Sequence, residues 1–376
     1  MASKRKFVAP SLGLFSLYGD LDKGSSSADN KKPSHSGNGD DDLNGVMEKR
    51  PKIEGNSASK VCAEENHGAA SNLPRLLSVC GWRRGEREDM QDAHILDDQF
   101  EVSSSNIKRC AFYAIFDGHA GKRAADFTAK HFPSVLKQKL SSCEDFDAFD
   151  KSVKRYFIES YKQIDEQFLT TARREKPSWK DGTTATTVLI FNDAVYCANI
   201  GDSRAVVCRS KESDGNVALQ LTVDHSPLNF DERMRIQKAG GSVKDGRIMG
   251  ILEVSRSIGD GQFKKHGVIC APDVKKFCIT ANDRFMIIAC DGLWKTFSNQ
   301  EAIDYTLSKL EEVEKSTEKE EADGDENLND FRSQLWEKVA GELAAESVRR
   351  GCGDNVSVIL VIFDDMSFQS KGKSLK

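Results

Sequence analysis

Three aspartates of this chain stand at the ends of apolar runs that we predict to be buried strands. They are Asp117 after 111–116, Asp291 after 285–290, and Asp354 before 356–363. An unpaired charge at the edge of a buried strand is costly to desolvate, although a single Asp beside a strand is ordinary turn chemistry. Here two of the three begin an Asp-Gly pair, and His119 follows the first by two residues. This pattern is typical of oxygen ligands around a hard cation, and it predicts a metalloenzyme.

The composition argues against several other classes of protein. The 376 residues include 54 Lys and Arg against 59 Asp and Glu, so the chain lacks the overall basic charge of a nucleic-acid-binding protein. No apolar stretch approaches the ~20 residues of a membrane span, and no long hydrophobic core of a secretory signal follows the first residues. The ten cysteines include no Cys-x-x-Cys pair, so we interpret most of them as reduced and buried. We therefore expect no nucleic acid and no membrane among the partners.

Residues 1–74 differ in composition from the rest of the chain. They are rich in Ser, Gly, Asp, Asn and Lys and poor in aromatic residues, so they bury too little apolar surface to offset the entropy of ordering. We predict a disordered polar tail at 1–74 and a short C-terminal tail at 365–376. The first tail carries basic clusters at 4–6 and 49–52, which serve either as a nuclear address or as solubilising charge. The expected location is cytoplasmic, nuclear or both.

The region between the tails, 75–364, is predicted to be one catalytic domain of class α+β. Strand-like runs are found at 111–116, 187–191, 194–199, 204–208, 218–222, 285–290 and 356–363. Helical patterns are found at 122–140, 149–174, 230–239, 299–311 and 330–350. Because most neighbouring strands are too close in sequence for a helical crossover, we expect antiparallel sheets that are covered by helices.

Two shorter features refine this prediction. Asn192 and Asp193 separate two of the strands and predict a tight hairpin. The acidic stretch 311–330 has no apolar face, and we predict an exposed insertion there.

Further motifs follow one another along the chain in a fixed order. The principal ones are 84–94 (RGEREDMQDAH), 117–119 (DGH), 181–186 (DGTTAT), 201–204 (GDSR), 253–261 (EVSRSIGDG) and 291–294 (DGLW). In this order they resemble the motif series of the metal-dependent type 2C serine/threonine protein phosphatases, over residues 76–364. Within that family, 179–182 (WKDG) and 253–261 are most similar to the integrin-linked-kinase-associated branch.

The resemblance implies a fold, an activity and a set of metal ligands. The fold is a β-sandwich of two antiparallel sheets flanked by helices, in α-β-β-α layers, with two Mn²⁺ or Mg²⁺ ions in a cleft at one end. The activity is hydrolysis of phosphoserine and phosphothreonine in proteins, by direct attack of a water that bridges the two ions. Carried over by motif, the metal ligands are Asp117, the Gly118 carbonyl, Asp291 and Asp354. Mn²⁺ and Mg²⁺ prefer carboxylate and carbonyl oxygens as ligands, and these are the groups that the four residues offer.

Three more residues receive roles from the same resemblance. Arg87 matches the arginine that binds the phosphoryl group, and a guanidinium can hold two phosphate oxygens at once. His119 matches the general acid that protonates the departing Ser or Thr oxygen. Asp92 matches an outer acid that orients metal-bound water. Without the motif, Arg87 would be a surface charge and His119 a structural group. The implied partners are phosphoprotein substrates, and we expect a monomer.

Two positions depart from the family pattern. Gln91 stands where the family often has Glu, so a neutral amide replaces a charge that organises water. Lys295 stands where the family often has an Asp that holds a third, weaker metal ion together with the counterpart of Asp202. A lysine at this position replaces a ligand with a cation, which argues against a third ion.

A cysteine-dependent phosphatase is the first rival interpretation. Cys278 and Arg284 have the Cys-x5-Arg spacing of that class. Such an enzyme needs a thiolate of low pKa in a loop of amides that faces the phosphate. The loop here contains no Gly and leads directly into the apolar strand 285–290.

The second rival is a binding module without catalysis, which would hold phosphoproteins through the same surface. Gln91 and Lys295 favour it, whereas the intact set of Asp117, Asp291 and Asp354 argues against it. A scaffold without catalysis has no need of three acids that are costly to bury. The sequence therefore favours a metal-dependent protein serine/threonine phosphatase.

Overall fold

The computed structural model describes residues 75–102, 108–141, 146–213, 215–317 and 328–364. All of them belong to one of the two units into which the chain divides, Val61–Lys376. The polar tails predicted at 1–74 and 365–376 lie outside the described residues, as does the central part of the predicted acidic insertion.

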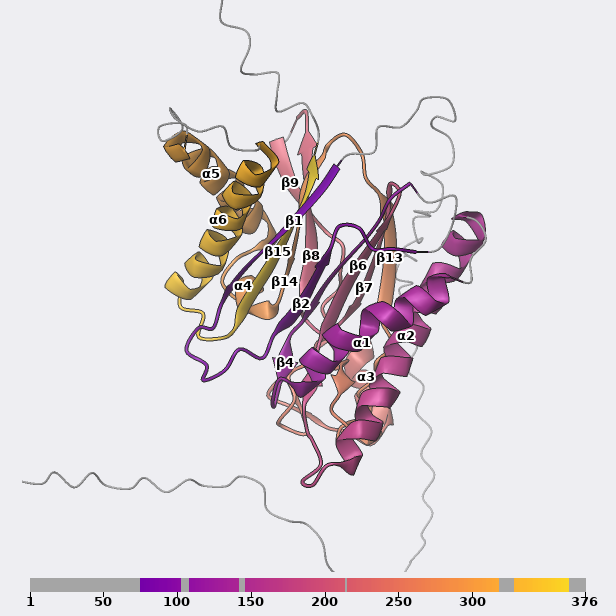
Figure 1. Ribbon diagram of the computed structural model, residues 1–376. Coiled ribbons are helices and arrows are strands. Elements are labelled where there is room, and N and C mark those ends of the chain that lie inside the picture. Colours follow the sequence, from indigo (N-terminus) through magenta and orange to yellow (C-terminus); the bar gives the residue numbers. More distant parts are fainter. Residues whose placement is uncertain (1–74, 103–107, 142–145, 214, 318–327, 365–376) are drawn as a thin grey trace, which may run out of the picture. The chain divides into compact units, whose positions relative to one another are not determined.

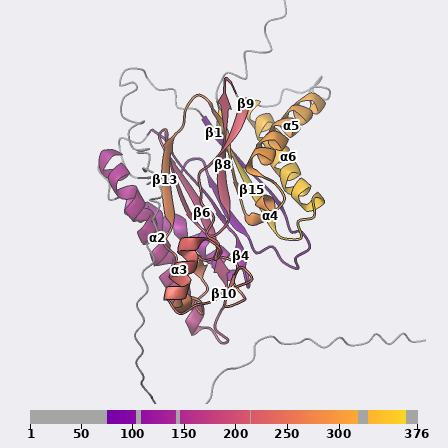
Figure 2. The ribbon, with the colours of Figure 1, turned by 180° about the vertical axis from the view of Figure 1, so that it is seen from behind.

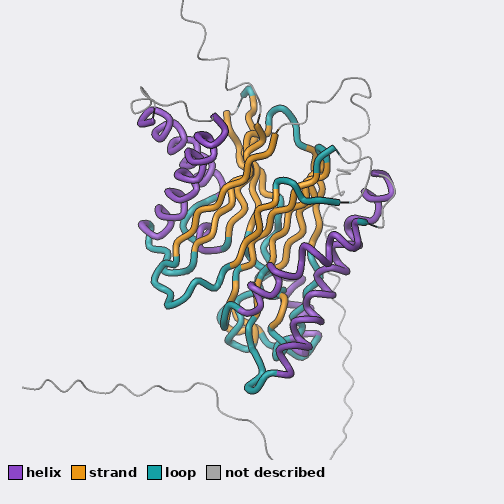
Figure 3. Tube along the Cα trace, viewed as in Figure 1, coloured by secondary structure: helices purple, strands orange, loops and turns teal. Residues whose placement is uncertain are grey.

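Two antiparallel sheets form the centre of this unit (Figures 1 and 3). The first has the order β1-β15-β14-β8-β9: β1 Arg75–Arg83, β15 Val356–Asp364, β14 Asp283–Ala289, β8 Arg204–Lys211 and β9 Gly215–Gln220. The second has the order β13-β7-β6-β3-β2: β13 Asp273–Cys278, β7 Ala194–Ile200, β6 Ala185–Phe191, β3 Cys110–Phe116 and β2 Ala93–Asp97. The predicted hairpin joins β6 and β7 and pairs Phe191 with Ala194, with Asn192 in the left-handed conformation at φ +57°.

The alternation of side chains along the central strands divides the interior into separate cores. In β3, Tyr113 and its neighbours at positions 111 and 115 face the other sheet, whereas Phe112, Ala114 and Phe116 face helices. Successive residues of a strand point to opposite faces, and both faces are covered here. This explains why the central strands appear in the sequence as continuous apolar runs.

Helices cover the outer face of each sheet (Figures 1 and 2). The second sheet packs against α1 Arg123–Leu140 and α2 Phe146–Arg174. The first sheet packs against α4 Asp291–Trp294, α5 Asn299–Thr317 and α6 Leu328–Arg349. The predicted α-β-β-α order of layers is confirmed. None of the helices in the described ranges is long and apolar enough to cross a membrane.

Smaller elements lie beside one end of the sandwich. A three-stranded sheet has the order β12-β5-β4, with β12 Ile258–Gly259, β5 Gly182–Thr183 and β4 Gly118–His119. Nearby lie α3 Phe230–Lys238, the hairpin of β10 Val243–Lys244 and β11 Arg247–Ile248, and the 3₁₀ helix η2 Lys264–His266.

The structure corrects the predicted elements in two ways. First, β1, β2 and β13 were not predicted, and all three are edge strands with partly exposed residues, so their apolar pattern is weak. Second, helix α5 continues to Thr317, and Val313 is only 6% exposed within the core of the first sheet. The first part of the 311–330 stretch is therefore helical: Val313 packs on the core, whereas Glu311, Glu312 and Lys315 around it are exposed.

Candidate active site

Five carboxylates lie around the same end of the two sheets. The second sheet contributes Asp117 after β3, Asp202 after β7 and Asp92 before β2, and the first sheet contributes Asp291 after β14 and Asp354 before β15. In an antiparallel sheet, the end of one strand lies beside the start of its neighbour. The connectivity of the strands thus brings together acids that are far apart in the sequence.

Asp117 occupies the centre of this acidic cluster. Oxygen atoms of Asp117, Asp202 and Asp291 lie within 4.8 Å of one another, and Asp117 also shares a 4.8 Å group with Asp92 and the Cys290 thiol. Asp117 therefore belongs to both groups of described side chains that are close enough together to hold a metal ion. The structure thus brings together the predicted ligands Asp117 and Asp291.

Burial and mutual repulsion raise the pKa values of these acids. Burial raises the pKa of Asp92 to about 6 and that of Asp202 to about 7, and neighbouring carboxylates add to both shifts. The pKa of Asp117 is raised well above its ordinary value, first by burial and then by Asp92, Asp291 and Asp202. The pKa of Asp291 is also raised by burial, although the Lys295 ammonium opposes the shift. These carboxylates therefore need cations nearby to remain ionised together.

The donor atoms of the cluster fit hard divalent cations. Oδ2 of Asp92 accepts a hydrogen bond from the Ser357 hydroxyl at 2.7 Å, whereas Oδ1 is buried and has no hydrogen-bond partner among the described residues. Burial raises the pKa of the Cys290 thiol well above its ordinary value, so that group stays protonated and is a poor ligand. Oxygen atoms remain as the available donors, which suits Mg²⁺ and Mn²⁺.

Gly118 lies directly beside the cluster and has no room for a side chain. A Cβ atom there would lie 2.3 Å from the carbonyl oxygen of Gln91. The preceding carbonyl, that of Asp117, accepts hydrogen bonds from the backbone N–H of Thr184 at 2.9 Å and from the Thr183 hydroxyl at 3.0 Å. The backbone that carries Asp117 is thus fixed by β5, and the role of the Gly118 carbonyl as a ligand stays a prediction.

Arg87 lies at the rim of the cluster, on a loop that Asn355 holds in place. Its Nη2 atom lies 2.9 Å from Oδ2 of Asp354, and its side chain is 60% exposed. The Asn355 amide nitrogen donates to the carbonyls of Arg84 at 2.8 Å and Asp89 at 3.1 Å, and its oxygen accepts from the backbone N–H of Gln91. Asn355, which follows Asp354 in the sequence, therefore holds the loop that carries Arg87 close to Asp354. The Arg87 guanidinium faces solvent.

His119 is held by a carboxylate that sequence reasoning did not assign to the site. Its Nε2 atom lies 2.7 Å from Oδ2 of Asp260, and the same oxygen accepts a 2.6 Å hydrogen bond from the Ser257 hydroxyl. Burial alone lowers the pKa of His119, but Asp260 outweighs it and the net shift is upward. Because one ring nitrogen is bound to Asp260, only Nδ1 remains for a reacting group. The segment 253–261 had been recognised as a motif, but its sequence gives no indication of this contact.

Small residues let Asp260 and its neighbours approach His119. A Cβ atom on Gly182 would lie 2.1 Å from Oδ2 of Asp260 and 2.3 Å from Nε2 of His119. Behind it, Asp181 accepts hydrogen bonds from the backbone N–H of Arg123 at 3.1 Å and from its Nε at 2.8 Å. The Asp181-Gly182 motif thus serves to pack the His119 side of the site.

Lys295 contacts two of the predicted metal ligands. Its Nζ atom lies 2.5 Å from Oδ2 of Asp291 and 3.4 Å from Oδ2 of Asp354. Burial opposes its charge, but Asp291 and Asp354 raise the pKa of Lys295 above its ordinary value, so the ammonium remains protonated. The departure from the family pattern thus places a permanent cation at the edge of the acidic cluster.

The structure argues against the cysteine-dependent alternative. Cys278 pairs with Ala194 in the ladder between β13 and β7, at the end of the sheet remote from Asp202. At the start of β14, the Asp283 carboxylate accepts hydrogen bonds from the backbone N–H of Thr280 at 2.8 Å and from Nε of Arg209 at 2.7 Å. A carboxylate therefore occupies the place where such a loop would hold a phosphate.

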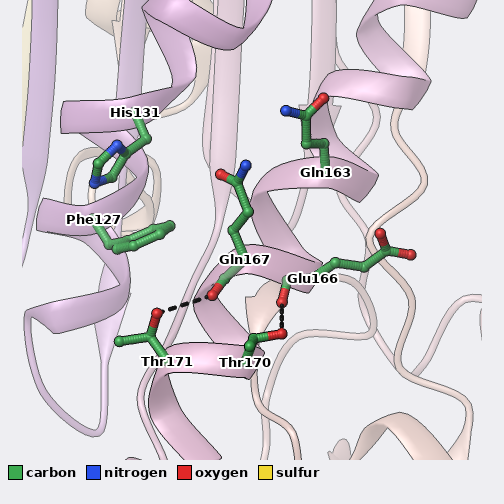
Figure 4. A pocket seen from close by; sticks show the side chains of 7 residues that line it. All are labelled: Phe127, His131, Gln163, Glu166, Gln167, Thr170 and Thr171. Carbon is green, nitrogen blue, oxygen red and sulfur yellow. Dashed lines mark hydrogen bonds between the residues drawn. The ribbon is translucent and has the colours of Figure 1, made fainter.

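A cavity on the helical layer does not belong to the acidic site. It lies between α1 and α2 (Figure 4) and is lined by Phe127, His131, Gln163, Glu166, Gln167, Thr170 and Thr171. The hydroxyls of Thr170 and Thr171 donate to carbonyls one turn earlier in α2, and no residue of the acidic cluster reaches it. We assign it no role in the chemistry.

Comparison with known proteins identifies the family of the chain. The chain matches the protein phosphatase 2C family model over residues 77–356. It is 43% identical over 322 residues to the integrin-linked kinase-associated serine/threonine phosphatase 2C of Mus musculus, covering 84% of this chain and 80% of that protein. It is 33% identical over 351 residues to the probable protein phosphatase 2C 67 of Oryza sativa subsp. japonica, covering 88% of each.

A solved structure supports the fold. The serine-threonine phosphatase 2C from Toxoplasma gondii superposes with a TM-score of 0.60 at 22% sequence identity, covering 78% of this chain and 98% of that one. With the match to the family model and to the two relatives, the conclusion is direct: this chain belongs to the protein phosphatase 2C family and is a metal-dependent serine/threonine phosphatase.

Proposed function

We propose that the acidic cluster holds two Mn²⁺ or Mg²⁺ ions, with Asp117 between them and with Asp291, Asp354 and the Gly118 carbonyl as the other protein ligands. The observation that carries this proposal is the group of three carboxylates, Asp117, Asp202 and Asp291, whose oxygen atoms lie within 4.8 Å of one another, with the Asp92 carboxylate equally close to Asp117. Bound ions of this kind lower the pKa of a water to make it a nucleophile and neutralise charge on the phosphoryl group.

The side chains around the cluster supply the remaining functions. Arg87 is exposed at the rim, where its guanidinium can bind and orient the phosphoryl group of a phosphoserine or phosphothreonine. His119 gives a proton from Nδ1 to the departing oxygen, and Asp260 holds the ring through Nε2. Asp92, bound through Oδ2 to Ser357, presents its free Oδ1 to water in the site.

A metal titration with a phosphothreonine peptide tests the ligand set. Turnover should require Mn²⁺ or Mg²⁺ and stop in excess chelator, and Asp117→Asn should abolish it and weaken Mn²⁺ binding measured by calorimetry. The matched control is Asp193→Asn, an exposed acid at the opposite end of β7, which should behave as wild type. Full turnover of Asp117→Asn, or unchanged Mn²⁺ binding, would contradict the assignment.

We also propose a substrate class, an oligomeric state and a location for this protein. The mouse relative is named for its association with integrin-linked kinase. For this chain we propose phosphoserine and phosphothreonine proteins as substrates and a monomeric enzyme. The basic clusters at 4–6 and 49–52 support a proposal of nuclear as well as cytoplasmic location. Loss of nuclear signal from a fluorescent fusion after neutralising both clusters would support it, and an unchanged distribution would contradict it.

A further inference from the structure

Two cations of this chain converge on one carboxylate oxygen at the edge of the acidic cluster. Nη2 of Arg87 lies 2.9 Å from Oδ2 of Asp354, and Nζ of Lys295 lies 3.4 Å from the same atom. The two nitrogens therefore lie within about 6 Å of each other, the sum of those distances. Two oxygens of one phosphoryl group, each accepting a charge-assisted hydrogen bond of about 2.8 Å, can span such a gap.

Both cations also face the solvent from which a substrate arrives. The Lys295 side chain is 48% exposed and that of Arg87 is 60% exposed, whereas the Asp291 side chain between Lys295 and the interior is 15% exposed. We propose that Lys295 is a second phosphate-binding residue, which acts with Arg87 to hold the phosphoryl group of the substrate. This proposal rests on the proposed function of the cluster.

The local structure gives Lys295 a fixed base and a mobile end. The backbone N–H of Lys295 donates to the carbonyl of Asp291 at 2.8 Å, and Nε1 of the adjacent Trp294 donates to the carbonyl of Ala289 at 2.9 Å. The Cα position is thus set by the one-turn helix α4, while the four-carbon side chain beyond it can rotate.

Which anion the Lys295 ammonium pairs with depends on what else is bound to Asp291. A divalent cation held by Asp291 and Asp354 would compete with Lys295 for carboxylate oxygens that the ammonium contacts in its absence. If the Lys295 ammonium leaves Asp291 while the backbone of the residue stays in place, the ammonium needs another anion within reach of the side chain. The phosphoryl group bound by Arg87 is that anion, and its oxygens accept hydrogen bonds from both side chains. Lysine thus supplies a permanent charge where relatives of the family often carry another acid.

The first test measures binding rather than turnover. Inorganic phosphate is titrated by calorimetry into full-length protein saturated with Mn²⁺. Loss of one charge-assisted hydrogen bond should weaken phosphate binding of Lys295→Gln about tenfold, and Lys295→Arg should retain most of the affinity. The matched control is Lys309→Gln, because Lys309 forms a 2.5 Å ion pair with Glu312 on α5 and lies outside the site. This variant should bind phosphate as wild type does.

Mn²⁺ affinity, measured in the same way, separates two roles of the lysine. Removal of a competing cation should leave Mn²⁺ binding of Lys295→Gln unchanged or tighter. Phosphate affinity within about twofold of wild type, together with tighter Mn²⁺ binding, would overturn the proposal and make Lys295 a counter-ion only. Absence of Mn²⁺-dependent phosphate binding in wild-type protein would instead count against the proposed function itself.

A measurement on the unmodified protein avoids any effect of the variants on folding. Acetic anhydride modifies exposed lysines, and mass spectrometry follows each site separately. With Mn²⁺ present, phosphate should slow the modification of Lys295 and leave that of Lys309 unchanged. Equal rates for Lys295 with and without phosphate would refute the proposal.

Discussion

Substitution of Asp202 would measure the repulsion among the acidic side chains of the cluster when no metal ion is bound. The pKa of Asp202 is raised to about 7 by burial and by Asp291, against an ordinary value of 3.8. An unfolded chain therefore releases this proton at lower pH than the folded protein does, so the folded state loses stability as pH rises from about 4 to about 7. Asp202→Asn keeps the shape of the side chain but cannot ionise, so it should escape this loss.

The magnitude follows from the size of the shift. One pKa unit corresponds to about 1.4 kcal/mol, so the displacement of Asp202 sets an upper limit of roughly 4 kcal/mol at pH 8. Neighbouring acids share the same proton and relax when one charge is removed, so we expect a gain of roughly 1–3 kcal/mol. In excess chelator at pH 8, Asp202→Asn should thus be more stable than wild type, and near pH 4 the two should be almost equal.

Urea unfolding followed by the fluorescence of the four tryptophans measures this difference. Asp224→Asn is the matched control, because Asp224 lies near the same end of the sandwich but already pairs with Arg204 at 2.7 Å. That variant should gain nothing at pH 8. A lower urea midpoint for Asp202→Asn than for wild type at pH 8, or an equal gain at both pH values, would refute the reasoning.

Three further predictions concern the chemistry. Asp260→Asn should slow turnover of a phosphothreonine peptide about tenfold or more but affect p-nitrophenyl phosphate less, since a phenolate leaves without a proton from His119; equal losses would contradict this role. Gly182→Ala should lose most activity, because the added Cβ overlaps His119 and Asp260; turnover within twofold of wild type in steady-state assays would show that the site can relax. Cys278→Ser should retain wild-type turnover, and chelator should still abolish it. Loss of activity in the same assay would support a cysteine-dependent mechanism instead.

The sequence predicted the central strands well because their residues are buried on both faces. β3, β6, β7, β14 and β15 are continuous apolar runs, and the acids at their ends mark where the sheets stop. Three of the four edge strands of these sheets, β1, β2 and β13, were missed for the opposite reason. β13, for example, has two adjacent exposed lysines, Lys275 and Lys276, between half-buried residues and carries no apolar run that distinguishes it from a loop.

The candidate site was predicted in part, through residues whose chemistry is evident from their type. Asp117 and Asp291 lie together in the acidic cluster, and Arg87 contacts Asp354 at its rim, while their roles stay predictions. The contact between His119 and Asp260 joins residues that are 141 positions apart, and no local pattern reports such a distance. The sequence shows Lys295 as a departure from the family pattern. Only the three-dimensional structure shows that Lys295 and Arg87 contact the same oxygen atom of Asp354.

The distribution of the acids between the two sheets has a consequence for the lifetime of the enzyme. Asp92, Asp117 and Asp202 belong to one sheet and Asp291 and Asp354 to the other, so a cation held among them crosslinks the sheets at that end. Its binding free energy then opposes every motion that separates the sheets there. When the cation is absent, repulsion favours local opening at the same place, which exposes backbone to proteases. The supply of divalent ions would thus set the rate of degradation of this protein as well as its rate of turnover.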